Sequence, residues 1–450
     1  MWQPKGKPCL ALRGIVLLSL TAGLTGAPVG SMPARAAPGL MLRSPLTAQC
    51  HQGCGEARRP EVPPGNGSGS FVAASTEPPT WALLPSPGPK PGERSYLEGI
   101  SCAKPSLCMA VGSDFGPSAN LTAPVAERWD GRSWSLLALP RSEGEGSLQS
   151  ISCVSVTFCM AVGSYYVQSH NLTAVLAERW DGTSWSVVPN PLPPAPGAAA
   201  ASMLLGVSCA NPAFCVAVGG EGDTPGSDSA IVESWDGHAW SVLKSPSLVG
   251  ASLTGVSCTS PGFCFAVGTK LSCNALGCQR AFAERWDGKS WQVAPSPSLG
   301  QVARTTAVSC VSTTFCAATG SWWRGPSAQP RPLVEFFDGS AWTVSHAHLS
   351  NESGAALNAV ACASPTWCVA VGGAGTQQQG KALVETYSAG TWSAMPSTTT
   401  PEAPQDLWSV ACVRAGLCVA AGYNQQRGSI LASPGFASSA HLLARGLVRW

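Results

Sequence analysis

Two cysteines with five residues between them recur seven times along this chain, and successive pairs are 49 to 56 residues apart. The pairs occupy positions 102/108, 153/159, 209/215, 258/264, 310/316, 362/368 and 412/418. A repeat of this period indicates copies of one supersecondary unit, and it outweighs local propensity as a guide to the fold. The repeated block extends from about Trp81 to Ile430 of the 450 residues.

The fourth copy shows what one unit contains. Short apolar runs at 253–258 and 264–268 flank the turn-forming Ser260-Pro261-Gly262, and runs at 281–286 and 290–294 flank Asp287-Gly288. Four short strands bounded by turn signals predict one antiparallel four-stranded sheet. No segment sustains a 3.6-residue apolar period with caps, so helices are not expected.

The second run of each copy is apolar on both faces, as in Cys-Met-Ala-Val-Gly at 108–112 and Cys-Val-Ala-Val-Gly at 215–219. Such a strand must be covered on both sides. Radial repetition of sheets achieves this and favours a β-propeller. A linear solenoid is the alternative, but it requires polar capping repeats that the sequence does not show.

The two ends of the repeated block complement each other. Before the first cysteine pair, residues 81–87 (Trp-Ala-Leu-Leu-Pro-Ser-Pro) match the fourth-strand signature at 291–297. After the seventh pair this signature is missing, and only 429–432 remains as a third strand. We therefore expect an all-β, seven-bladed β-propeller of four-stranded antiparallel blades, closed by an N-terminal strand that completes the last blade and removes two exposed edges.

The hairpin between third and fourth strands recurs as Glu-Arg-Trp-Asp-Gly-x-Ser-Trp at 127–134, 178–185 and 284–291. It resembles the Asp-box hairpin of sialidase-type propellers and, more loosely, kelch hairpins, although Asp and Gly are adjacent here. With its Ser-Cys and Cys-x-Ala-Val-Gly elements, the whole repeat resembles seven-bladed propeller repeats of secreted bacterial proteins. This resemblance implies a fold and not an activity, because propellers support many functions.

The paired cysteines flank a short turn between two paired strands, so we expect their Cα atoms to approach within disulfide range. Each bridge closes a small loop and should contribute roughly 2 kcal/mol on the chain-entropy model. The expected disulfides are Cys102–Cys108, Cys153–Cys159, Cys209–Cys215, Cys258–Cys264, Cys310–Cys316, Cys362–Cys368 and Cys412–Cys418, with Cys273–Cys278 as a further staple in one loop. Zinc sites favour other spacings with recurring partners, so neither a metal nor another cofactor is expected.

The N-terminus has the features of an export signal. Lys5, Lys7 and Arg13 precede an apolar run at 14–29, and Ala34-Arg35-Ala36 offers a cleavage site. The alternative, a membrane anchor, is disfavoured because Gly26 and Pro28 break the run.

We therefore divide the chain into a signal peptide (1–36), a flexible Pro/Gly/Ser-rich leader (37–80), the propeller (81–435) and a C-terminal tail (436–450). The mature protein should be secreted or associated with the cell surface, with no integral membrane span, which suits the many cysteines. Cys50 and Cys54 lie in the leader and pair either with each other or with another molecule.

The charge balance excludes one class of partner. Charged residues make up 12% of the chain and the net charge is +2, with the Lys and Arg residues scattered. This composition gives no electrostatic footprint for nucleic acid.

The repeated Glu, Arg, Trp and Asp residues are best explained by structure. We expect Trp to pack between sheets, Asp-Gly to form the turn and Glu to pair with an Arg on a neighbouring blade. A sialidase-like enzyme needs arginines, a tyrosine and acids that converge at the axis, and no such set is evident outside the repeat signature. His346 and His348 could form a metal pair, but a solvated loop is favoured because fixed partners are missing.

The loops between first and second strands, and between third and fourth strands, are uniform and should lie at one face. The opposite face carries loops that vary in sequence, so recognition is expected there. The candidate ligand-binding residues in these loops are Phe115, Tyr165, Tyr166, Trp322, Trp323, Arg324 and Tyr423. Exposed aromatics beside Arg and amides suit a carbohydrate or protein ligand, although rings that simply cover the blade ends explain the pattern equally well.

The sequence therefore predicts an exported, disulfide-stapled, monomeric propeller that acts as a binding or scaffold module for a glycan or an extracellular protein. The alternative is a glycoside hydrolase or lyase of the sialidase-like type, and a third possibility is a structural element of a cell wall or matrix. Two carboxylates from outside the repeat signature, meeting at the axial opening with raised pKa values, would favour the enzyme.

Overall fold

Every regular element in the part of the chain that the structure describes is a β-strand. The computed structural model describes residues 81–88, 94–115, 122–140, 145–169, 171–191, 201–222, 229–246, 250–271, 279–297, 302–325, 328–345, 354–375, 380–395, 406–424 and 428–433. These segments all belong to one unit, Ser75–Trp450. Within them no helix is long and apolar enough to cross a membrane.

The strands follow the four positions expected from the sequence repeat. The first strands are β2 (Arg94–Lys104), β6 (Gly146–Ser155), β10 (Ala201–Asn211), β14 (Ala251–Ser260), β18 (Val302–Ser312), β22 (Ala356–Ser364) and β26 (Asp406–Arg414). The second strands are β3 (Leu107–Phe115), β7 (Phe158–Val167), β11 (Phe214–Gly222), β15 (Phe263–Leu271), β19 (Phe315–Trp323), β23 (Trp367–Ala374) and β27 (Leu417–Tyr423). The third strands are β4 (Thr122–Trp129), β8 (Leu172–Trp180), β12 (Ser229–Trp235), β16 (Gln279–Trp286), β20 (Arg331–Phe337), β24 (Lys381–Ser388) and β28 (Gly428–Ala432). The fourth strands are β5 (Trp134–Leu137), β9 (Trp185–Val187), β13 (Trp240–Val242), β17 (Trp291–Ala294), β21 (Trp342–Val344), β25 (Thr391–Ala394) and β1 (Ala82–Leu84).

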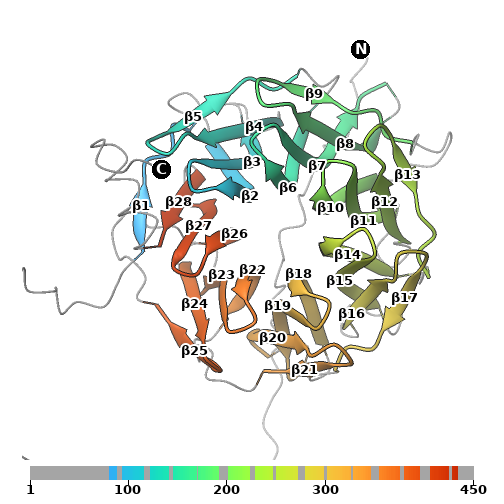
Figure 1. Cartoon of the computed structure of the whole chain (residues 1–450), viewed down its shortest axis with the longest axis vertical. Helices are drawn as coiled ribbons and strands as arrows, with labels where there is room; N and C mark the ends of the chain where they lie inside the picture. The colour runs from blue at the N-terminus through green and yellow to red at the C-terminus, as the bar shows by residue number, and fades with distance from the viewer. Residues whose placement is uncertain are drawn as a thin grey trace, which may run out of the picture. The chain divides into compact units, whose positions relative to one another are not determined.

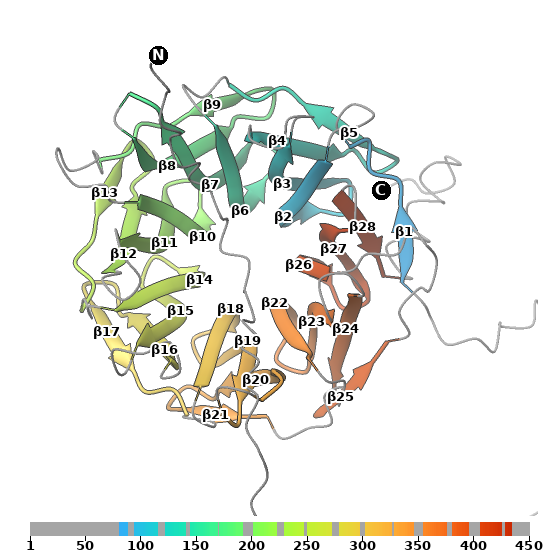
Figure 2. The same ribbon diagram turned by 180° about the vertical axis from the view of Figure 1, so that it is seen from behind.

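Consecutive strands pair in antiparallel meanders of four, so the predicted repeated antiparallel sheets are confirmed. The meanders β6–β9 and β10–β13 are joined into one eight-stranded sheet by a single parallel bridge between Thr173 and Ala201. Figures 1 and 2 show the meanders around a common centre, with the first strands innermost and the fourth strands outermost. This radial arrangement of four-stranded sheets is that of a β-propeller.

The last meander combines strands from both ends of the described chain. β26, β27 and β28 are followed in the sheet by β1, whose Ala82 pairs with Ala432 and whose Leu84 pairs with Ile430. Figure 1 shows the blue β1 beside the red β28. The predicted pairing of the N-terminal strand with the last repeat is therefore present.

The apolar core lies between neighbouring meanders and not within one sheet. Met160 and Val162 of β7, for example, share a buried cluster with Leu204 of β10 and Trp235 of β12. The first and last meanders make the same kind of contact, because Leu97 of β2 belongs to a cluster with Leu417, Val419, Ala421 and Ile430. Both faces of the second strands are covered in this way, as their doubly apolar sequences predict.

Each of the seven repeated cysteine pairs forms a disulfide, and the two cysteines lie directly opposite each other on the first and second strands. Their Cα atoms are 3.9 to 4.1 Å apart, which is closer than the range we expected from disulfides in general. The reason is direct cross-strand pairing, which brings opposite Cα atoms nearer than most disulfides do. Cys273–Cys278 and the Cys50 and Cys54 pair lie outside the described residues, as do the signal peptide, the leader, the tail, His346 and His348.

The glycine that ends each Cys-x-Ala-Val-Gly element is required by a close approach of two backbones. A β-bulge in each first strand, such as the register shift between Leu253 and Gly255, pushes its chain against the second strand. A Cβ atom on Gly268 would lie 2.0 Å from the carbonyl oxygen of Ser252, and the equivalent glycines of the other six meanders show the same contact at 1.8 to 2.1 Å. Backbone atoms cannot move aside as a side chain could, so only glycine fits.

Replacing Gly268 with alanine should therefore lower the free energy of unfolding by about 1–3 kcal/mol or more, since this is the usual cost of overpacking a core. Gly262→Ala is the matched control, because the nearest atom to a Cβ there is the Ser260 hydroxyl oxygen at 3.8 Å. Thermal unfolding of the oxidised proteins measures both. Equal melting temperatures for Gly268→Ala and the wild type would contradict this explanation of the motif.

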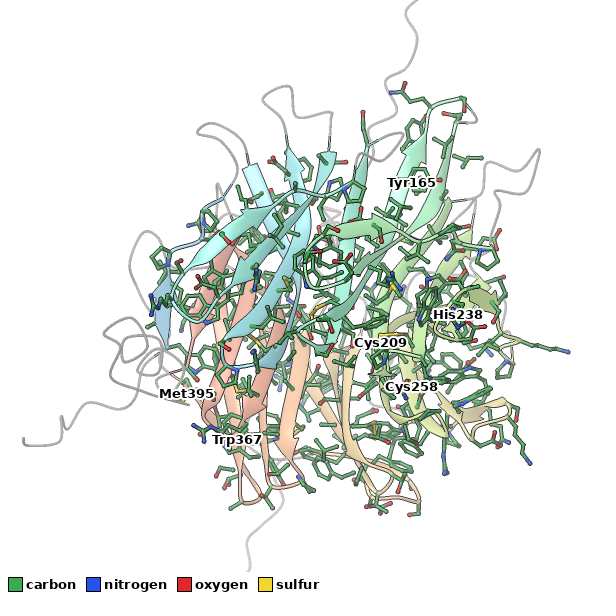
Figure 3. The ribbon with its side chains drawn as sticks, turned by 45° about the horizontal axis from the view of Figure 1, so that its top comes forward. Tyr165, Cys209, His238, Cys258, Trp367 and Met395 are labelled. Carbon is green, nitrogen blue, oxygen red and sulfur yellow. A yellow bond between two sulfur atoms is a disulfide. The ribbon has the colours of Figure 1, made fainter. Side chains whose placement is uncertain are left out.

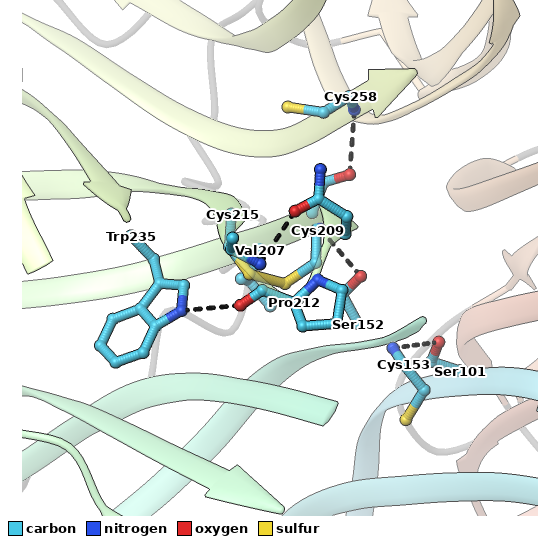
Figure 4. Close-up of a disulfide and its surroundings, with 12 residues drawn as sticks. Ser101, Ser152, Cys153, Val207, Cys209, Pro212, Cys215, Trp235 and Cys258 are labelled. Carbon is cyan, nitrogen blue, oxygen red and sulfur yellow. Dashed lines mark hydrogen bonds between the residues drawn. A yellow bond between two sulfur atoms is a disulfide. The ribbon is translucent and has the colours of Figure 1, made fainter. Parts of the chain in front are cut away.

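The serine that precedes most first cysteines ties one meander to the next. Ser101, Ser152, Ser208, Ser257 and Ser309 each accept, through Oγ, the backbone N–H of the next meander's first cysteine at 2.9 to 3.0 Å. Figure 4 shows three of these bonds, to Cys153, Cys209 and Cys258. The last two meanders have Ala361 and Ala411 at this position, and the junction between the last meander and the first instead uses Ser409 Oγ, which accepts the N–H of Ile100 at 3.1 Å.

Candidate ligand-binding face

The two ends of each meander differ in how they are built. One end, here called the repeat face, carries the cysteine hairpins and the Asp-Gly hairpins, and the other, the variable face, carries the ends of second strands and the starts of first and third strands. On the repeat face the Asp-Gly turns are alike: Asp287 Oδ1 accepts the N–H groups of Lys289 and Ser290, both at 2.8 Å, and Gly288 adopts φ 93°. These backbone N–H groups hold the pKa of Asp287 below its ordinary value.

Four aromatic rings gather on the variable face where the first and last meanders meet. Tyr96 of β2 lies 5.1 Å from Phe115 of β3, 5.6 Å from Trp408 of β26 and 4.9 Å from Tyr423 of β27, measured between ring centroids. Trp408 and Tyr423 are also 4.9 Å apart. All four side chains are half-buried, so this group, here called the seam cluster, presents a continuous aromatic surface.

A half-buried carboxyl lies beside the seam cluster. Asp406 Oδ2 accepts the indole N–H of Trp408 at 3.2 Å, and its Oδ1 accepts the side-chain amide of Asn358 at 2.8 Å. Burial raises the pKa of Asp406 to about 6 despite these bonds. Burial, with the neighbouring Asp406 and Tyr96, also raises the pKa of Tyr423.

A second carboxyl from outside the repeat signature lies on β2. Glu98 occupies the bulge of this strand, between the register positions of Leu97 and Gly99. Its Oε1 accepts the hydroxyl of Ser113 at 3.1 Å, and burial raises its pKa to about 7. Two carboxyl groups with raised pKa values, Glu98 and Asp406, therefore lie on the adjacent inner strands β2 and β26. Both already accept hydrogen bonds from neighbouring side chains.

A separate aromatic pair ends β19. Trp323 lies under the guanidinium of Arg304, 5.3 Å from the ring centroid, and Trp322 lies under that of Arg331 at 5.9 Å. Arg304 Nε also donates to Gln279 Oε1, and burial lowers the pKa of Arg304. Each indole is thus paired with an arginine from a neighbouring strand, in a cation–π contact.

The tyrosines of β7 contribute differently. Tyr165, labelled in Figure 3, packs partly against the core cluster that contains Leu148 and Leu176. Tyr166 donates its hydroxyl to Asn171 Oδ1 at 2.6 Å. Both side chains are half-buried and hold the end of the β7–β8 pair together.

The structure brings only some of the predicted ligand-binding residues together. Phe115 and Tyr423 meet around Tyr96, whereas Tyr165 and Tyr166 lie on β7, and Trp322, Trp323 and the exposed Arg324 lie at the end of β19. The seven residues thus mark three places on the variable face and not one.

Sequence reasoning missed Tyr96, Trp408 and Asp406, because it searched the loops after second strands and not the starts of first strands. A signal was available at Trp408. Its position corresponds to the first-strand bulge, where Thr254, Thr306 and Asn358 donate to a backbone carbonyl oxygen of the next meander at 2.9 to 3.0 Å. The last meander has an indole at this position, and Trp408 contacts the ring of Tyr96 in the first meander.

The repeated glutamates of the third strands are buried, and the arginine partners that we expected for them are not their hydrogen-bond donors. The donors come from the linker of the preceding meander: Ser86 Oγ to Glu127 at 2.7 Å, Asn190 Nδ2 to Glu233 at 2.5 Å, Ser245 Oγ to Glu284 at 2.7 Å and Ser296 Oγ to Glu335 at 2.8 Å. The arginines of the signature contact aromatic rings instead: the guanidinium of Arg128 lies 5.9 Å from the ring centroid of Trp180, and that of Arg285 lies 5.2 Å from the ring centroid of Phe263. These contacts support the structural role assigned to the glutamates.

Glu178 is the exception that tests this role. Its side chain is fully buried, and neither carboxyl oxygen has a hydrogen-bond partner among the described residues. Leu139 stands in the preceding linker, five residues after Trp134, where the linkers before Glu284 and Glu335 carry Ser245 and Ser296. Burial raises the pKa of Glu178 to about 7, as it does for Glu127, Glu233 and Glu335.

These shifts predict that the protein loses stability as pH rises from about 4.5 to about 7. In this window the folded chain holds protons on the glutamates that the unfolded chain, with ordinary pKa values near 4.5, has released, so the free energy of unfolding falls as pH increases. Thermal unfolding at pH 5 and pH 8 should show the higher melting temperature at pH 5. A melting temperature that rises over this range would contradict the assignment.

Glu178→Gln should remove one part of this dependence, because glutamine stays neutral at every pH. The variant should melt above the wild type at pH 8, and the two should converge near pH 4, where Glu178 is protonated in both states. An unchanged difference across this pH range would show that Glu178 is not the titrating group.

No protein-family model matches the sequence, and no curated protein matches it either. Among solved structures, the chain is similar to YCF48 bound to D1 peptide (14% identity, 80% of this chain and 96% of that chain covered, TM-score 0.48) and to YCF48 from Cyanidioschyzon merolae (15% identity, 79% and 98% covered, TM-score 0.47). It is also similar to a GH74 xyloglucanase from Xanthomonas campestris (12% identity, 76% and 52% covered, TM-score 0.49), of whose length it spans about half. At these identities and TM-scores the three proteins carry no argument about ligand or activity, which must come from the residues of this chain.

Proposed function

We propose that this chain is an exported, seven-bladed, closed β-propeller that binds a carbohydrate or protein ligand on its variable face. The observation that carries the proposal is the contrast between the two faces. The repeat face ends in near-identical turns that satisfy their own backbone, as Asp287 does, whereas the variable face ends in half-buried aromatic rings and arginines that differ from meander to meander. Folding alone requires the first pattern and does not require the second.

The meanders support a count of seven blades. We count β6–β9 and β10–β13 as two blades, because only one bridge joins them, and β26–β28 with β1 as the last. Contact between β2 and β26, and a shared core across this junction, support closure of the ring. A closed ring leaves the variable face as one surface, on which residues from different blades can act on the same ligand.

Export is supported by the disulfides and by the signal-like segment at 1–36. The seven disulfides are typical of proteins in an oxidising compartment. We therefore place the protein outside the cell or at its surface, as a monomer that scaffolds or binds and needs no cofactor.

The proposed ligand-binding residues are those of the variable face: Phe115, Tyr165, Tyr166, Trp322, Trp323, Arg324 and Tyr423, joined by Tyr96 and Trp408. Flat rings offer contact area at a low entropic cost, and Arg adds directional donors, which together suit sugars or a protein surface. The seam cluster is the largest group of rings among these residues and is shared by two blades.

A glycoside hydrolase of propeller type is the second candidate, and Glu98 and Asp406 are the observation in its favour. Both lie outside the repeat signature, on adjacent inner strands, with raised pKa values, as expected of catalytic acids. Each, however, is held by neighbouring side chains, Ser113 for Glu98 and Trp408 with Asn358 for Asp406. Binding without hydrolysis therefore remains our proposal.

A screen of the purified protein against a glycan array and a panel of extracellular proteins tests the proposal. Trp322→Ala and Trp323→Ala test the end of β19, and Phe115→Ala tests the seam cluster. The variants at the place that holds the ligand should weaken its binding by about 10-fold or more for a ring at the centre of the contact. Lys289→Ala, in an exposed turn of the repeat face, is the matched control and should bind as the wild type does.

Two results would overturn the proposal. Binding that all three aromatic variants retain would place the ligand elsewhere, and loss of binding in Lys289→Ala would point to the repeat face. Release of reducing sugar from the bound glycan, abolished by Asp406→Asn, would replace binding by the hydrolase alternative.

A further inference from the structure

Basic residues of the variable face are concentrated in three neighbouring meanders. At the strand ends on this face, the three consecutive meanders that start with β14, β18 and β22 carry basic side chains: Lys270, Arg280, Arg304, Arg324, Arg331 and Lys381. We call these residues the basic sector. The remaining meanders carry mainly acidic residues at or near the corresponding ends: Glu98, Asp114, Glu145, Glu221 and Asp406, with Arg94 as the basic residue at the start of β2.

Among the described residues of those three meanders, no carboxylate lies at the variable face. Glu284, Glu335 and Glu385 are buried within third strands, and Asp287 and Asp338 form hairpin turns on the repeat face. A chain with a net charge of only +2 therefore concentrates positive charge over one part of one face. Such a local field attracts an anionic ligand even when the whole protein is almost neutral.

The β18–β21 meander places aromatic rings within this charge. Arg304 and Arg331 stand over Trp323 and Trp322 from the strands on either side of β19, and Arg324 is exposed directly beyond the two indoles. Gln279 fixes the guanidinium of Arg304 through Nε. The two terminal nitrogens of Arg304, Nη1 and Nη2, can then donate a pair of parallel hydrogen bonds to a carboxylate.

We propose that the basic sector binds an acidic polysaccharide, with sugar carboxylates held by Arg304, Arg324 and Arg331 and sugar rings placed against Trp322 and Trp323. This inference rests on the proposed binding function and names its ligand class. Three successive meanders offer cations at corresponding strand ends, and a polymer with an anionic group on each repeating sugar matches this periodic charge better than an isolated anion does. The indoles favour sugar rings over a flexible acidic peptide, because they offer flat apolar area beside the arginines.

The test uses the full mature protein and a matched pair of ligands: polygalacturonate oligosaccharides and the same oligosaccharides with their carboxyl groups reduced to alcohols. The acidic form should bind with an affinity at least about 10-fold higher than that of the reduced form. Its affinity should fall as NaCl is raised from about 0.05 to about 0.5 M, because salt screens contacts between exposed charges. Poly-glutamate should bind more weakly than polygalacturonate.

Variants of Arg331 distinguish a paired guanidinium–carboxylate contact from attraction by positive charge alone. Arg331→Gln, at an exposed position, should weaken binding of polygalacturonate about 10-fold, as loss of a charged hydrogen bond predicts. Arg331→Lys should recover only part of the loss, because an ammonium group cannot form the paired contact. Arg132→Gln, in a turn of the repeat face, should bind as the wild type does.

The possible failures are distinguishable. Equal affinity for the acidic and reduced oligosaccharides, or full binding by Arg331→Gln, overturns the acidic polysaccharide and leaves a neutral ligand on the same face. Tighter binding of poly-glutamate also overturns it, in favour of an acidic peptide. If neither these ligands nor any member of the glycan and protein panels bind, the proposed function itself fails.

Discussion

The pairing of β1 with β28 is the contact on which the rest of the structure depends. It supplies the fourth strand of the last meander from the opposite end of the described chain, and it covers a sheet edge that would otherwise offer unpaired backbone groups to other chains. The core shared by Leu97 and Ile430 then joins the first and last meanders. Because these two meanders are adjacent, residues far apart in sequence, Tyr96 and Tyr423, share one surface.

The two ends of the strands therefore have different roles in this arrangement. The bulge that forces glycine at Gly268, the serine that accepts a cysteine amide and the buried third-strand glutamate are all repeated, and all serve contacts within or between meanders. They leave little sequence freedom on the repeat face and inside the sheets. Diversity is therefore confined to the variable face, which is where aromatic rings and arginines gather.

The sequence predicted the fold far better than the site, for physical reasons. Strand positions, cysteine pairing and the role of residues 81–87 depend on patterns that repeat, so an assignment made in one copy is supported by the same pattern in the others. The site depends on single residues whose neighbours come from other meanders. Trp408 stands four residues before Cys412, as Thr254 does before Cys258, but the sequence does not show that this position faces the next meander. The glutamates were assigned arginine partners because the linker serines, such as Ser86, are distant in sequence.

The serine-to-amide bonds have a consequence for local opening of the sheets. They occur at five successive junctions, but Ala361 and Ala411 interrupt the series on both sides of the last meander. The sheet that both chain ends complete therefore lacks this serine bond on both sides, and its polar contacts with its neighbours are those of Asn358 and Ser409 instead. The amide protons of Cys412 and Cys102, which have an alanine where the other first cysteines have this serine, should therefore exchange before those of Cys153, Cys209, Cys258, Cys310 and Cys362.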